Sequence, residues 1–88
     1  MRRKNDFILQ NIGGQDFLVP LGARVLDLNC IIVLNVTARH IWELLAEDRS
    51  LDDLVAAIVN CFDVETWRAQ IDVSAFLADI AKWEGIET

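Results

Sequence analysis

Few side chains in this sequence have the chemistry that catalysis or metal binding requires. The chain has one histidine, His40, and two cysteines, Cys30 and Cys61. A structural zinc site needs four ligands at short spacings, and a catalytic triad needs a nucleophile beside its base. Neither pattern is present, so we predict no catalytic residue, no metal site and no cofactor. We interpret the two cysteines as small buried hydrophobic residues and His40 as a partly exposed helical residue.

The remaining polar motifs have structural explanations. Asp52-Asp53 falls in the first turn of an expected helix, where negative charge suits the helix dipole. Gly13-Gly14 stands alone and forms no glycine-rich phosphate loop. We therefore expect a protein that is not an enzyme.

Composition limits the function further. Eighty-eight residues, 53% of them apolar and 25% charged, predict one globular domain over residues 1–88. The net charge of −6 disfavours binding to phosphate backbones. The basic start, Met1 to Asp6, has no apolar stretch after it, so it does not resemble a signal peptide. We predict a cytoplasmic protein whose residues 1–6 are mobile.

Strand signals occupy residues 7–34. Phe7–Ile12 and Asp16–Pro20 flank Gly13-Gly14, a dipeptide suited to a tight hairpin turn. Cys30–Leu34 is rich in β-branched residues and carries no charge, which predicts a strand that is apolar on both faces. Helices can cover one face, which leaves the other face or a free edge for something else.

Helix signals fill the rest of the chain, with helices expected at about 36–46, 51–61 and 65–83. Ser50 and Asp53 are spaced as a capping box for the second helix. Gly85 suits the left-handed position after the third helix, with Ile86 folding back on its last turn. Apolar residues recur at helical spacing and predict the core: Ala38, Ile41, Trp42, Leu45, Leu51, Leu54, Val55, Ile58, Phe62, Ala69, Val73, Phe76, Leu77 and Ile80.

This order of elements predicts an α+β fold. Three N-terminal antiparallel strands would pack on a C-terminal three-helix bundle, in a winged-helix-like outline. A fold of this outline does not by itself define a function.

Three functions agree with these observations. If Cys30–Leu34 lies at a sheet edge, its free backbone groups could accept a peptide as an added strand; if it is internal, it has no such role. A winged-helix DNA-binding regulator is an alternative, although the third helix balances Arg68, Gln70 and Lys82 with several acidic residues. The other alternative is a small dimerisation module that pairs through the same edge.

The sequence also resembles the PqqD-like family. The resemblance rests on an ordered set of segments that covers nearly the whole chain. Val36 departs from the family, which more often has a polar residue or proline there, and Glu87 replaces a usual apolar residue. The matching segments are Phe7–Ile12, Gly13-Gly14, Leu18–Gly22, Leu34–Ala38, Ile41–Leu45, Ser50–Val55, Phe62–Val64, Asp72-Val73, Phe76-Leu77 and Gly85-Ile86.

The resemblance implies a peptide chaperone for ribosomally made precursor peptides. Such proteins bind the leader segment as an antiparallel strand beside the third strand and present the core segment to a modifying enzyme, often a radical-SAM enzyme. The implied strand wall is Cys30, Ile31, Ile32 and Val33. The implied helix wall is Arg68, Ile71, Asp72, Ala75 and Asp79. The expected partners are therefore a leader peptide and a radical-SAM enzyme, with no nucleic acid and no membrane, and the chain is expected as a monomer or weak homodimer.

Overall fold

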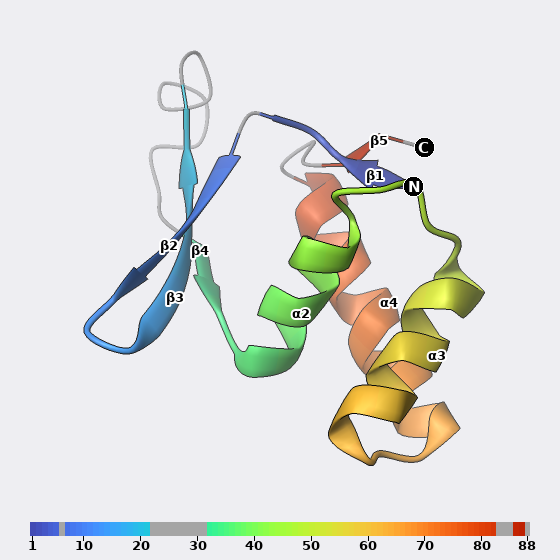
Figure 1. Cartoon of the computed structure of the whole chain (residues 1–88). Coiled ribbons are helices and arrows are strands. Elements are labelled where there is room, and N and C mark those ends of the chain that lie inside the picture. Colours follow the sequence, from blue (N-terminus) through green and yellow to red (C-terminus); the bar gives the residue numbers. More distant parts are fainter. Residues whose placement is uncertain (6, 22–31, 83–85, 88) are drawn as a thin grey trace.

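The computed structural model describes residues 1–5, 7–21, 32–82 and 86–87. Within them a three-stranded antiparallel sheet, ordered β2-β3-β4, precedes three helices, which confirms the predicted fold class. The sheet stands on one side of the molecule and the helices gather on the other, with α2 next to the sheet (Figure 1). The elements are β1 (Arg2–Arg3), β2 (Phe7–Ile12), β3 (Gln15–Pro20), β4 (Ile32–Leu34), α2 (Val36–Leu44), α3 (Leu51–Phe62), α4 (Thr66–Lys82) and β5 (Ile86–Glu87).

Two glycines set the register of the first hairpin. Gly13 and Gly14 have φ values of 61° and 83°, a region that residues with a Cβ rarely adopt. The resulting register pairs Phe7 with Pro20 and Leu9 with Leu18. Side chains alternate across a sheet, so the inward set that includes Leu18 is buried against the helices. The outward set stays exposed and includes Ile8, Ile12 and Val33.

Trp42 joins the sheet to the helices. Its side chain is 1% exposed and belongs to a cluster with Phe7, Leu18, Leu34 and Ile80. The Phe7 ring meets it edge-on, with ring centroids 6.1 Å apart. A second cluster holds the three helices together around Ile41, Leu45, Leu54, Val55, Ile58, Ala69, Val73 and Leu77. Two residues predicted for the core are not fully buried: Leu51 is exposed and Phe62 is half-buried.

A polar contact also links β3 to α2. The carboxylate of Asp16, which is 8% exposed, accepts a hydrogen bond from Asn11 Nδ2 at 3.0 Å. It lies 3.5 Å from Arg39 Nη1, and Arg39 Nε donates to Glu43 at 2.7 Å. The hydrogen bond to Glu43, followed by the charge of Asp16, raises the pKa of the Arg39 guanidinium above its ordinary value. Because the carboxylate of Asp16 is buried but paired, it anchors the sheet to α2.

Side chains cap two of the helices. Asn35 Oδ1 accepts from the Ala38 N–H at 2.8 Å, so Asn35 begins α2. Ser50 and Asp53 form the capping box predicted for α3: Asp53 N donates to Ser50 Oγ, and Ser50 N donates to Asp53 Oδ2. The three helices begin and end within two residues of the expected bounds. Gly85, the expected cap of α4, lies outside the described residues.

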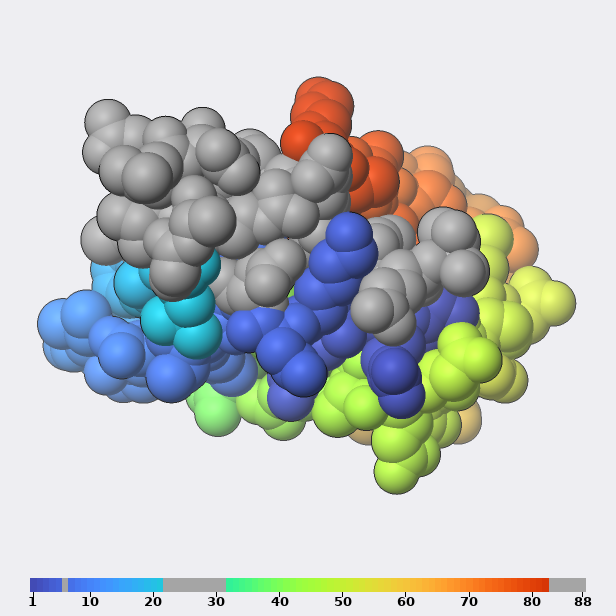
Figure 2. All heavy atoms as spheres, turned by 90° about the horizontal axis from the view of Figure 1, so that it is seen from above, coloured from blue at the N-terminus to red at the C-terminus, as the bar shows by residue number. Residues whose placement is uncertain are grey.

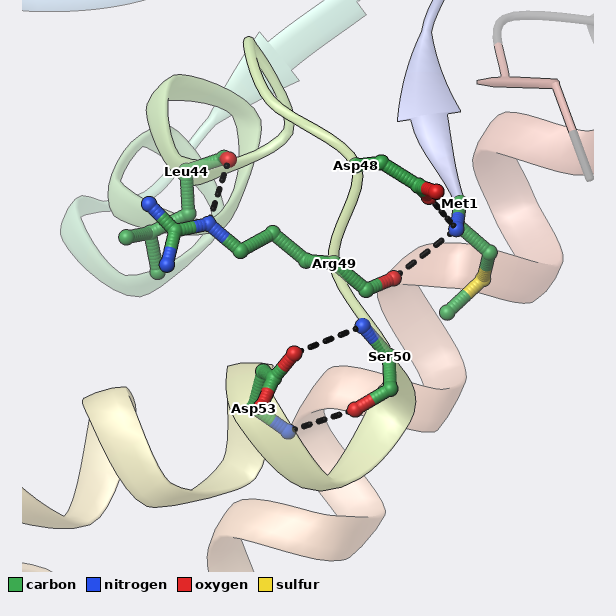
Figure 3. A network of polar contacts seen from close by, with 6 residues as sticks. All are labelled: Met1, Leu44, Asp48, Arg49, Ser50 and Asp53. Atoms are coloured by element: carbon green, nitrogen blue, oxygen red, sulfur yellow. Dashed lines mark hydrogen bonds and ion pairs between the residues drawn. The ribbon is translucent and has the colours of Figure 1, made fainter.

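The first residues take a place that the sequence analysis did not anticipate. Instead of a mobile tail, Arg2–Arg3 pairs antiparallel with Ile86–Glu87, the segment expected to fold back on α4. The Met1 amine donates to Asp48 Oδ1 and to the Arg49 carbonyl, beside the capping box (Figure 3). Seen from above, this segment crosses the face between the hairpin strands and the link after α2 (Figure 2). A backbone hydrogen bond also joins this segment to the link after α2, because Arg49 N donates to the Met1 carbonyl.

The structure bears on the predictions for the cysteines and for His40. Cys61 is exposed rather than buried, because it follows the outward face at the end of α3. His40 is half-buried, as expected for a helical residue, and its ring meets Phe62 edge-on at 5.5 Å. Cys30 lies outside the described residues. No helix in the described ranges is both long and apolar enough to cross a bilayer.

Truncating Trp42 tests its role between the sheet and the helices. Trp42→Ala removes a fully buried ring, so we expect a loss of about 3–5 kcal/mol in the free energy of unfolding. Urea denaturation followed by far-UV circular dichroism measures it. Trp67→Ala is the matched control: Trp67 is 56% exposed, and its loss should change stability by less than about 0.5 kcal/mol. Equal losses in the two variants would contradict this assignment.

The capping box gives a second prediction. Ser50→Ala should lower the free energy of unfolding by about 1 kcal/mol.

The hydrogen bonds from Ser50 hold the pKa of the Asp53 carboxyl below its ordinary value. A carboxyl whose pKa is lower in the folded state stabilises the fold fully above its ordinary pKa, and this contribution is lost as pH falls toward the lowered pKa. Asp53→Asn should therefore flatten the acid limb of the stability curve below about pH 4, measured by urea denaturation across pH.

Candidate functional site

A groove of about 520 Å³ runs between β4 and α4, with the start of α2 closing its base. Its lining combines a strand edge, the first turn of α2 and one flank of α4. The lining residues are Ile32, Val33, Leu34, Asn35, Thr37, Ala38, Ile41, Arg68, Asp72, Ala75, Phe76 and Asp79.

The strand wall of the groove is the edge of the sheet. β4 pairs with β3 in a register that sets Leu18 opposite Ile32 and Phe17 opposite Val33. Within the described residues no strand lies on its other side. Alternate residues of β4 direct their backbone N–H and C=O groups to that side, away from β3. The end of β4 is held in place, because Gln15 Nε2 donates to the Leu34 carbonyl at 3.1 Å.

The two faces of β4 differ in burial. Leu34 points inward and is 2% exposed, whereas Val33 points outward and is 61% exposed. Ile32 is half-buried and packs against the cluster that contains Trp42. The strand therefore presents an apolar surface on the groove side and an exposed valine on the outer face.

The helix wall carries charges at regular spacing. Arg68, Asp72, Ala75 and Asp79 recur at four, seven and eleven residues, which places them on one flank of α4. Arg68 Nε lies 3.4 Å from Asp72 Oδ2. At the far end, Lys82 Nζ lies 3.9 Å from Asp79 Oδ1. These pairs are largely exposed to solvent, so each is weak and can open when another charge approaches.

The structure brings together most of the residues that the sequence assigned to a site. Of the nine, the groove is lined by Ile32, Val33, Arg68, Asp72, Ala75 and Asp79. Ile71 does not line it: it is 57% exposed on the adjoining flank of α4. Cys30 and Ile31 lie outside the described residues.

Several groove residues come from positions that sequence reasoning assigned to capping or to the core. Asn35 does cap α2, yet it also lines the groove, as does Thr37. Ala38 and Phe76 belong to core stripes but lie at their margins, where they are half-buried. Half-burial at the margin of a stripe is the signal that could have found them, because such residues border both the core and the adjoining surface.

The described lining of the groove is apolar at its base and charged at its rim. Its ionisable side chains are two carboxylates, Asp72 and Asp79, and one guanidinium, Arg68. Among the described residues no group of three His, Cys, Asp or Glu side chains is placed to hold a metal ion. Among these residues the groove combines the outer edge of β4 with an apolar base and a charged rim.

Comparisons with known proteins agree with this architecture. A solved structure described as "TbiB1 in Complex with the TbiA(beta) Leader Peptide" shares the fold, with a TM-score of 0.75 and 23% sequence identity. The match covers 99% of this chain and 95% of that one. No curated protein matches the chain at a significant level. The profile of the family described as "Coenzyme PQQ synthesis protein D (PqqD)" matches residues 20–83, almost three quarters of the sequence, and the chain therefore belongs to the PqqD family.

Proposed function

We propose that this protein binds the leader segment of a ribosomally synthesised precursor peptide and presents that peptide to a modifying enzyme. The leader adds as an antiparallel strand to the free edge of β4. The observation that carries the proposal is that, in the part of the chain that the structure describes, β4 is the last strand of the sheet and borders a groove whose other wall is α4.

Strand addition fits the physical character of this edge. Backbone N–H and C=O groups of a guest strand would pair with those of β4, which gives affinity that depends weakly on guest sequence. Side chains of the guest alternate, so every second one would enter the groove. There the base formed by Ala38, Ile41 and Phe76 offers an apolar contact, which selects guests with apolar side chains at those positions.

The comparisons support this function. The structural neighbour is described as a complex with a leader peptide, and it covers nearly the whole chain. The family takes its name from the synthesis of a coenzyme, which is a biosynthetic setting. The recipient in our proposal is a radical-SAM enzyme, the partner that the sequence resemblance implies.

The role proposed is binding and not catalysis. His40, the single histidine, packs edge-on against Phe62 and does not line the groove. A chaperone needs none of the acid, base or nucleophile placements of an enzyme.

The charges of α4 do not favour DNA binding. α4 would have to present cations, but Arg68 and Lys82 each lie beside an aspartate of the same helix. Edge-to-edge dimerisation would use the same edge of β4 as a guest strand, and sedimentation at two protein concentrations distinguishes a dimer from a monomer that binds peptide.

Charged substitutions on β4 test the proposal. A displayed library of random dodecapeptides is selected on the wild-type protein, and the affinities of enriched peptides are measured by calorimetry. Ile32→Asp should abolish their binding, because it places a charge on the apolar groove side of the docking strand. Val33→Asp should weaken binding at least about ten-fold, because Val33 borders the groove and its side chain would lie beside the outward side chains of a docked strand. Since Val33 is 61% exposed, the fold should survive.

Ile12→Asp is the matched control for both variants. Ile12 is 60% exposed and lies on β2, at the opposite edge of the same sheet. It should keep wild-type affinity, and circular dichroism should show the same helical content in all variants. Enriched peptides that bind Ile32→Asp and Val33→Asp as tightly as Ile12→Asp would rule out β4 as the docking strand.

A further inference from the structure

The groove has opposite charges at its two ends, and this asymmetry bears on the order of charges in the sequence of the guest peptide. Figure 1 shows β4 and α4 running in opposite directions, so that α4 begins at the end of the groove where β4 leads into α2. Arg68 is the third residue of α4 and Asp79 the fourth from its end. Both residues line the groove, and the opposite directions of the two elements assign Arg68 to the end where β4 leads into α2 and Asp79 to the end where β4 begins in the described chain.

The local ion pairs leave both charges able to reach a guest. The Arg68 side chain is 60% exposed and its contact with Asp72 spans 3.4 Å. The Asp79 side chain is 59% exposed and its contact with Lys82 spans 3.9 Å. Exposed pairs of this kind are worth little, so an opposite charge on a docked strand competes with them on equal terms.

An antiparallel guest has a defined orientation along this charge axis. Both pairings within the sheet are antiparallel, and a guest that continues the pattern runs opposite to β4. It therefore runs in the same direction as α4, with its N-terminal part beside Arg68 and its C-terminal part beside Asp79.

From this juxtaposition we infer that the groove selects a guest segment with an acidic residue on the N-terminal side of an apolar stretch and a basic residue on the C-terminal side. The inference rests on the proposed function, since it assigns the chemistry of the peptide that the same groove binds. Arg68 and Asp79 are the residues that read the polarity of the guest.

The helix also fixes the spacing of the two charges. Arg68 and Asp79 are eleven residues apart, or roughly 16 Å along the axis of α4. An extended chain covers that length in about five residues. Both guest charges must face α4, and residues on one face of a strand are two apart. The acidic and basic guest residues should therefore be separated by four or six positions, with apolar residues facing the groove between them.

Two synthetic peptides test this inference. Both are acetylated and amidated decapeptides with the same Val- and Ile-rich centre; one has Glu before the centre and Lys six positions later, and the other has the two exchanged. By calorimetry at low salt, the wild type should bind the Glu-to-Lys peptide about ten-fold more tightly, since each exposed pair contributes about three-fold. Raising the salt to about 0.5 M should reduce the difference.

A charge-reversed protein provides the decisive comparison. The double variant Arg68→Glu, Asp79→Lys should prefer the Lys-to-Glu peptide by a similar factor. Glu47→Lys, which changes net charge as Asp79→Lys does but lies in the link after α2 with a side chain 79% exposed, should keep the wild-type preference.

The outcomes separate this inference from the proposed function. If both peptides bind the wild type and the double variant equally, the polarity is overturned while strand addition stands. A wild-type preference for the Lys-to-Glu peptide overturns the antiparallel orientation. If neither peptide nor any library peptide binds, the groove is not a peptide site and both proposals fall.

Discussion

The packing of Trp42 between the sheet and the helices is the contact on which the rest of the structure depends. Phe7, Leu18 and Leu34 of the sheet meet the helices in this cluster, and Ile80 brings α4 into it. Arg3 stacks its guanidinium 5.5 Å from the Trp42 ring and donates to the Trp42 carbonyl, so the N-terminal strand is tied to the same residue. Because Leu34 of β4 and Ile80 of α4 both pack in this cluster, its packing sets the separation of the two elements that form the groove.

Much of the fold could be predicted because local signals and burial agree. The glycine pair, the Ser50–Asp53 capping box and the helical apolar stripes each act over a few residues, and the structure realises each one. The pairing of Arg2–Arg3 with Ile86–Glu87 could not be predicted, since it joins opposite ends of the chain. Its backbone hydrogen bonds depend little on side-chain identity, so the sequence carries no pattern for it.

Part of the candidate site could likewise be predicted from the sequence, and part could not. The family resemblance implied a helix wall, and four of its residues, Arg68, Asp72, Ala75 and Asp79, share one flank of α4 and line the groove. Ile71 sits one position from Asp72, about 100° around the helix, which is enough to turn it away from the groove. Whether β4 was internal or at an edge stayed open in the sequence, because an uncharged β-branched run suits both positions. The strand order decides between them, and over the described ranges it places β4 at the end of the sheet.

The chemistry of strand addition has a consequence for how a guest leaves the groove. Each backbone hydrogen bond between a guest and β4 replaces one that both partners make with water, so its net contribution is about 1 kcal/mol. In the proposed function a docked leader therefore dissociates spontaneously, and its delivery needs no nucleotide hydrolysis.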